Sequence, residues 1–147
     1  MLKDALKFFH AYINEMIEVG GENLPRAVST KLGAKLAALY KEKGVNDFTT
    51  ALETAYKALG ASISIKKIDE NTYLIKLKHS KKFCPIGGKS NPTSAKNIQD
   101  SICFPYTRSF LTNLFPEFQF ETESVECIVD NSNSHCNYKL KVKKNSC

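Results

Sequence analysis

Apolar residues recur at helical spacing through the N-terminal part of the chain. This spacing predicts helices over residues 2–19 and 25–43, and a third helix that Asn46 or Asp47 can cap and that Gly60 ends. A stripe of this kind buries one face of a helix and leaves the other in water. The stripe of the first helix consists of Leu2, Leu6, Phe9, Ile13, Met16 and Ile17.

The pattern then changes to a rough alternation of apolar and polar residues. Residues 62–68 and 73–78 predict a first hairpin, and residues 118–142 predict a second one around the turn-forming cluster 130–134. Alternation gives each strand one buried and one solvated face, which is typical of an antiparallel sheet.

The segment between the two hairpins has a different composition. From His79 to Asn97 it is rich in Lys, Gly, Pro and Ser, which predicts a long loop that carries Cys84. Residues 95–114 predict a helix that is interrupted near Pro105. The order ααα-ββ-α-ββ has no βαβ alternation, so we expect an α+β fold with an antiparallel sheet, as one domain over residues 1–147.

The net charge of +6 comes mostly from lysine. Many of these lysines alternate with apolar residues, which predicts a solvated sheet face that also discourages edge-to-edge association. Nucleic-acid binding is the alternative, but no helix-turn-helix, RNA-binding or zinc-finger pattern supports it. The lysines in question are Lys66, Lys76, Lys78, Lys139, Lys141 and Lys143.

No apolar run approaches the roughly 20 residues that span a bilayer. The N-terminal segment carries Asp4, His10, Asn14 and Glu15 where a signal peptide would be apolar. We therefore expect a cytoplasmic protein that does not bind membranes.

Cysteines are the clearest candidates for chemistry. Cys127 and Cys136 flank the turn of the second hairpin, so antiparallel pairing would bring them together as a metal pair or a disulfide. Cys103 lies on or near the helix before that hairpin, and Cys84 on the preceding loop. In a cytosolic chain, clustered cysteines indicate metal or redox chemistry more often than structural disulfides. Burial as small apolar residues is the other interpretation.

The C-terminal third resembles the 4-vinyl reductase domain family, and above all its small archaeal single-domain members. The resemblance rests on Cys103, the segment 111–116 (LTNLFP), the pair Glu126-Cys127 and Cys136. It implies a fold related to haem-NO-binding domains and TRAPP subunits. It also implies a domain that binds a small hydrophobic or aromatic molecule, such as a hydrocarbon.

The same resemblance implies a zinc ion. Sensor domains of the family hold zinc with cysteines that correspond to Cys103, Cys127 and Cys136, together with a carboxylate. Our preferred fourth ligand is Cys84, because Glu126 would point to the other face of a regular strand. Glu123, His135 and water are the other candidates. Four protein ligands would make the zinc structural.

Aromatic residues predict a ligand pocket between the helices and the sheet. The candidates are Phe9, Tyr12, Phe104, Tyr106 and Phe110, and ordinary core packing is the alternative for each of them.

We find no pairing of a nucleophile with a base and no nucleotide fingerprint. The leading hypothesis is therefore a binding or sensing domain rather than an enzyme. The alternatives are a reductase that acts on a vinyl-bearing tetrapyrrole and a protein-interaction subunit. The second predicted helix has small residues at Gly33, Ala34, Ala37 and Ala38, which is equally consistent with close packing and with a homodimer through the N-terminal helices.

Overall fold

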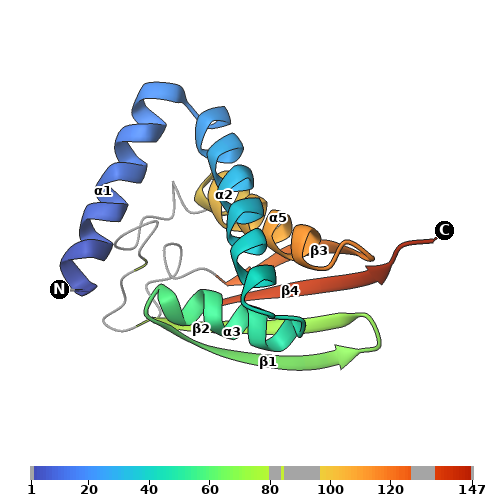
Figure 1. Cartoon of the computed structure of the whole chain (residues 1–147). Helices are drawn as coiled ribbons and strands as arrows, with labels where there is room; N and C mark the ends of the chain where they lie inside the picture. Colours follow the sequence, from blue (N-terminus) through green and yellow to red (C-terminus); the bar gives the residue numbers. More distant parts are fainter. Residues whose placement is uncertain (1, 80–83, 85–96, 127–134, 147) are drawn as a thin grey trace.

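The computed structural model describes residues 2–79, 84, 97–126 and 135–146. Its fold is α+β, as predicted, and the elements follow the predicted order (Figure 1). In chain order they are α1 (Leu2–Gly20), α2 (Asn23–Glu42), α3 (Phe48–Ala58), β1 (Ala61–Asp69), β2 (Thr72–His79), the π-helical turn η2 (Gln99–Cys103), α5 (Phe104–Leu114), β3 (Phe118–Glu126) and β4 (His135–Lys144).

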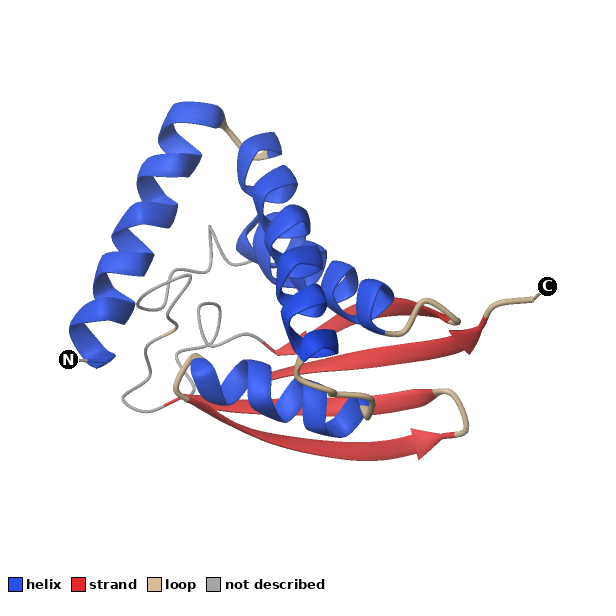
Figure 2. Cartoon of the chain, viewed as in Figure 1, coloured by secondary structure: helices blue, strands red, loops and turns tan. Residues whose placement is uncertain are grey.

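The two hairpins join into one antiparallel sheet with the strand order β1-β2-β4-β3. Strands β2 and β4 form its centre, where Ile75 lies opposite Tyr138 and Leu77 lies opposite Cys136. Figure 2 shows the helices gathered on one side of this sheet. The sheet therefore has one face for the core and one for water.

The lysine pattern is confirmed as a solvated sheet face. Lys66, Lys76 and Lys78 are exposed on β1 and β2, between inward residues such as Ile65 and Leu77. Two lysines of β4 lie opposite acidic residues of β3, with Lys141 opposite Glu121 and Lys139 opposite Glu123. Such cross-strand pairs of opposite charge favour this register.

The other sheet face packs against helices α3 and α5, and α2 lies over α5. The core fills this layer because the inward positions of the strands and the apolar stripes of the helices meet there. Its largest fully buried apolar side chains are Leu52 of α3, Ile75 of β2, Phe110 and Leu111 of α5, and Leu140 of β4.

Helices α2 and α5 approach each other closely at Gly33. A Cβ atom at this position would lie 2.5 Å from the carbonyl oxygen of Tyr106 and 2.9 Å from the backbone nitrogen of Phe110. The Ser109 hydroxyl donates a hydrogen bond to the carbonyl oxygen of Thr30 across the same crossing, at 2.6 Å. Of the small-residue face of α2, Gly33 and Ala37 are buried inside the chain, whereas Ala38 is exposed.

The predicted helix boundaries are close to those in the structure. Asp47 caps α3, because its carboxylate accepts a hydrogen bond from the backbone N–H of Thr50 at 2.9 Å. Gly44 and Gly60 follow α2 and α3 with φ of 76° and 77°, a conformation that residues with a Cβ rarely adopt.

The predicted interruption near Pro105 is corrected by the structure. Pro105 sits in the first turn of α5, where its missing N–H costs nothing. The irregularity lies just before it, in the π-helical turn Gln99–Cys103, which continues directly into α5.

Several predictions fall on residues outside the described part of the chain. These are the turn cluster 130–134, most of the loop 79–97, Cys127 and Cys147. Within the described part, no helix combines the length and apolar character needed to cross a membrane.

The crossing of α2 and α5 generates a stability prediction. Gly33→Ala should gain about 1 kcal/mol of helix propensity. It should lose more through the clash with backbone atoms of α5, which cannot move as a side-chain tip can. We expect a net loss of about 2 kcal/mol in the free energy of unfolding, measured by denaturant titration.

Ala38→Leu provides the control for this substitution. It adds a larger side chain to the exposed face of the same helix, where we expect a change within about 0.5 kcal/mol. A Gly33→Ala protein more stable than the parent would show that the two backbones do not touch.

Candidate functional site

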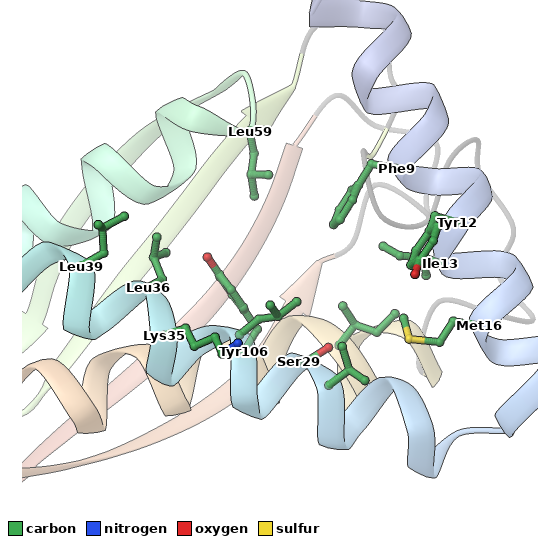
Figure 3. A pocket seen from close by; sticks show the side chains of 13 residues that line it. Phe9, Tyr12, Ile13, Met16, Ser29, Lys35, Leu36, Leu39, Leu59 and Tyr106 are labelled. Carbon is green, nitrogen blue, oxygen red and sulfur yellow. The ribbon is translucent and has the colours of Figure 1, made fainter.

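A groove of about 480 Å³ lies between α1 and α2 (Figure 3). Helix α1 leans away from the rest of the fold and meets α2 at an angle (Figure 1). Leu59, just after α3, and residues of η2 and α5 complete its wall. The described lining residues are Phe9, Tyr12, Ile13 and Met16 of α1; Val28, Ser29, Leu32, Lys35, Leu36 and Leu39 of α2; and Leu59, Ile102 and Tyr106.

Helical spacing explains why these side chains meet. Phe9, Ile13 and Met16 follow one another at intervals of four and three residues on α1, and so do Leu32, Leu36 and Leu39 on α2. Each stripe is apolar but only partly buried, since Ile13 is 3% exposed whereas other lining residues keep much of their surface in water. Tyr12 is 64% exposed, Leu32 47% and Leu39 45%. The groove is therefore apolar and open to solvent.

The aromatic residues predicted for a pocket lie in two places. Phe9, Tyr12 and Tyr106 line the groove. Phe110 is fully buried in the core, with its ring edge-on to that of Tyr40 at 5.4 Å between centroids. Phe104 packs edge-on against Tyr138 of β4, at 5.9 Å.

The sequence reasoning did not assign the α2 wall of the groove. Residues 25–43 were predicted only as an amphipathic helix. Its apolar residues Val28, Leu32, Leu36 and Leu39 would have the same periodicity in a buried face and in a groove wall. Lys35 lies between two of these residues. A lysine inside an apolar stripe is the signal that could have indicated a wall facing solvent.

A second group of functional side chains lies between α3, α5 and the sheet. The hydroxyl of Tyr56 is 3.0 Å from the hydroxyl of Tyr138 and 3.1 Å from that of Thr107. Burial raises the pKa of Tyr56 to about 12, although the hydrogen bonds with Thr107 and Tyr138 oppose the rise. Burial raises the pKa of Tyr138 well above its usual value, and the neighbouring Tyr56 adds to this rise. We call Tyr56, Thr107 and Tyr138 the hydroxyl cluster.

Two of the predicted metal ligands adjoin the hydroxyl cluster. Cys103 and Cys136 both lie near enough to Tyr56 that a thiolate at either position would raise the pKa of its phenol further. Cys136 is two residues before Tyr138 on β4, and Cys103 precedes Phe104, which packs on Tyr138. The fold therefore brings these cysteines, distant in sequence, to one region of the core.

The remaining two predicted cysteine ligands are Cys84 and Cys127. Cys84 is buried, and Cys127 lies outside the described part. Within the described part, no three His, Cys, Asp or Glu side chains gather closely enough to hold a metal ion. The four-cysteine site depends on Cys127 and stays a prediction.

The alternative fourth ligands are placed by the strand register. Glu123 is exposed opposite Lys139, and His135 lies opposite Lys78. The register of β3 shifts between Ser124 and Glu126, so that Glu126 pairs with Asn137. Strand β3 is thus irregular next to Glu126. The preference for Cys84 over Glu126 as the fourth ligand presumed a regular strand there.

The π-helical turn η2 lies between the groove and the hydroxyl cluster. Ile102 lines the groove, and its neighbour Cys103 lies beside the cluster. The hydroxyl of Ser101 is buried and has no hydrogen-bond partner among the described residues. A π-helical turn widens the helix by one residue and often occurs at functional sites.

Comparison with known proteins shows the fold. No protein-family model matches the chain, and no curated protein matches it. A solved structure of trafficking protein particle complex subunit 3 from Naegleria fowleri, covalently bound to palmitic acid, is similar with a TM-score of 0.65 at 13% identity. The match covers 97% of this chain and 95% of that one.

A second solved structure is the phenol-responsive sensory domain of the transcription activator PoxR with phenol. It is similar with a TM-score of 0.52 at 15% identity, over 92% of this chain and 73% of that one. At these identities the likeness shows a shared fold, and the TRAPP-like architecture is confirmed. The resemblance to the 4-vinyl reductase domain family is not addressed by these matches and stays a prediction.

The buried tyrosines predict a loss of stability at high pH. In the folded chain, burial raises the pKa of Tyr56 and of Tyr106 to about 12, whereas an unfolded tyrosine titrates at about pH 10. Between these values the unfolded state binds fewer protons, so each tyrosine lowers the free energy of unfolding by about 1.4 kcal/mol per pH unit. We expect denaturant titrations to show this fall starting near pH 10.

Tyr56→Phe tests the structural origin of the fall. This substitution removes one titrating phenol, so the free energy of unfolding should fall less steeply with pH, by the contribution of one proton. At neutral pH it should cost about 1–3 kcal/mol, because the hydroxyls of Thr107 and Tyr138 lose their shared partner. Tyr12→Phe, at an exposed tyrosine, should change neither quantity. Identical pH profiles for the parent and Tyr56→Phe would contradict the burial of this phenol.

Proposed function

We propose that the chain is a binding domain for a small apolar molecule, which is held in the groove between α1 and α2. The observation that carries this proposal is the open, apolar groove of about 480 Å³, a volume within the range of about 300–1,000 Å³ typical of ligand pockets. Its lining contains aromatic, aliphatic and thioether side chains and very few polar groups.

Exposed apolar surface gives the physical reason for binding. Tyr12, Leu32 and Leu39 keep a large part of their surface in water. Covering apolar surface is favourable by about 25 cal/mol per Å², so an apolar ligand between the helices gains this free energy. Two proteins with a similar fold support the proposal, since one was solved with palmitic acid and the other with phenol.

A protein-interaction role is the second candidate. Phe8 and Val19 of α1 are 74% and 83% exposed and do not line the groove. Helix α1 thus has apolar residues on a second side, which a homodimer through the N-terminal helices would cover. One protein of similar fold is a complex subunit. The reductase alternative rests on the resemblance alone.

We further propose that Cys84, Cys103, Cys127 and Cys136 hold a structural zinc. The nearness of Cys103 and Cys136 to the same phenol supports this proposal. Such a zinc would tie the start of α5 to the second hairpin and stabilise the fold.

Metal analysis tests the zinc. We expect natively purified protein to contain about one zinc ion per chain, and a chelator to lower its Tm. Cys136→Ser should lose the metal, and Cys147→Ser, at the last residue of the sequence, should keep it. Native protein without zinc would contradict the proposal.

A neutral fluorescent probe tests the groove. N-phenylnaphthylamine should bind with increased fluorescence, and Leu32→Glu should weaken the binding at least about tenfold because it puts a charge on the apolar wall. Leu32 is half-exposed, so the fold should tolerate this change.

Ala38→Glu is the matched control for this experiment. It adds the same charge to the same helix at an exposed position outside the groove lining, and it should bind the probe as the parent does. Equal binding by all proteins, or by none, would count against the groove as the binding site.

A further inference from the structure

The groove has one charged side chain among its described lining residues, Lys35. Figure 3 shows Lys35 with Tyr106 and Ser29, across the groove from Phe9 and Tyr12 of α1. Lys35 is exposed, so its aliphatic stem follows the apolar wall while its ammonium group reaches water. No carboxylate belongs to the described lining.

The size of the groove limits the shape of the ligand. A cavity of about 150 Å³ lined by similar side chains is enough to bind benzene. The groove, at about 480 Å³, would therefore be left mostly empty by a single ring. Unfilled apolar space loses dispersion contacts, so a longer molecule gains more from the same walls.

The shape of the lining indicates a chain-like ligand. The apolar residues of α2 run for three helical turns, from Val28 to Leu39, and those of α1 from Phe9 to Met16 face them. Lys35 interrupts the α2 row towards its C-terminal end, between Leu32 and Leu36. A chain whose tail lies along Val28 and Leu32 would thus have its polar end near the ammonium group.

We propose that the groove takes a single-chain amphiphile with a carboxylate head group, and that Lys35 pairs with the carboxylate. This inference rests on the proposed function and adds the chemical class of the ligand. The chain supplies most of the affinity, at about fourfold per buried methylene. Lys35 makes the groove selective for the head group, because its positive charge attracts an anion and repels a cation.

Ligands with a common chain separate the two contributions. Decanoate, decanol and decyltrimethylammonium are used to displace N-phenylnaphthylamine at monomeric concentrations and low salt. We expect decanoate to bind about three- to fivefold more tightly than decanol, as for an ion pair that stays in contact with water. The cation should bind more weakly than decanol, and added salt should narrow both differences.

Lys35→Met tests whether Lys35 is responsible for the preference for a carboxylate head group. It keeps an apolar stem and removes the charge, so the ratio of decanoate to decanol affinity should fall by the three- to fivefold advantage, whatever the change in decanol binding itself. Lys35→Arg should retain that advantage. Lys31→Met is the matched control, because Lys31 is an exposed lysine one turn earlier on α2 that does not line the groove.

The outcomes separate this inference from the proposed function. If the neutral probe does not bind, the proposed function itself fails. If probe and decanol bind but decanoate has no advantage, or if Lys35→Met and Lys31→Met behave alike, the groove binds apolar molecules and the carboxylate inference is wrong.

Discussion

The close crossing of α2 over α5 is the constraint on which the rest of the structure depends. At Gly33 the two backbones approach so closely that no side chain fits between them. Because α5 packs on the sheet, this crossing fixes the direction of α2 relative to the whole core. Thr30 and Ser109 add a hydrogen bond that sets the register along the contact.

The groove follows from this crossing. On the C-terminal side of Gly33, the face of α2 that carries Ala37 and Tyr40 is buried in the core. The neighbouring face, with Leu32 and Leu36, is turned towards α1 instead. Tyr106 contributes to both regions, since its backbone oxygen meets Gly33 and its ring lines the groove. Any shift in the crossing would change the width of the groove.

Polar groups in the core have a comparable organising role on the sheet side. The hydroxyl of Tyr56 joins Thr107 of α5 to Tyr138 of β4, so one hydrogen-bonded group ties three elements together. Buried hydroxyls stabilise a fold only when each is paired, which restricts these elements to one arrangement. Cys103 and Cys136 lie at the edge of this network.

Periodicity was sufficient to predict the elements, their order and the lysine-rich face of the sheet. It was insufficient wherever two elements meet. The alternation of residues 118–126 predicts a strand, but the shift between Ser124 and Glu126 depends on pairing with β4 and has no local sequence signal. Likewise, Pro105 suggested an interruption of the helix, although the backbone change lies in the preceding π-helical turn.

The groove was only partly predictable for a related reason. Phe9 and Tyr106 were chosen because they are aromatic, and they do line it, but Phe110 has the same character and is in the core. Residue type indicates that a side chain prefers an apolar environment, and it does not say whether protein or ligand provides it.

For α1, leaving part of its apolar stripe in water has a cost in free energy. A helix whose apolar stripe is only partly covered has given up part of the free energy that close packing would supply, of about 25 cal/mol for each Å² left in water. Closing α1 onto α2 would recover it and would remove the groove. An apolar ligand between the two helices would cover the same surface without any change in the fold, so the exposed part of the stripe favours an occupied groove.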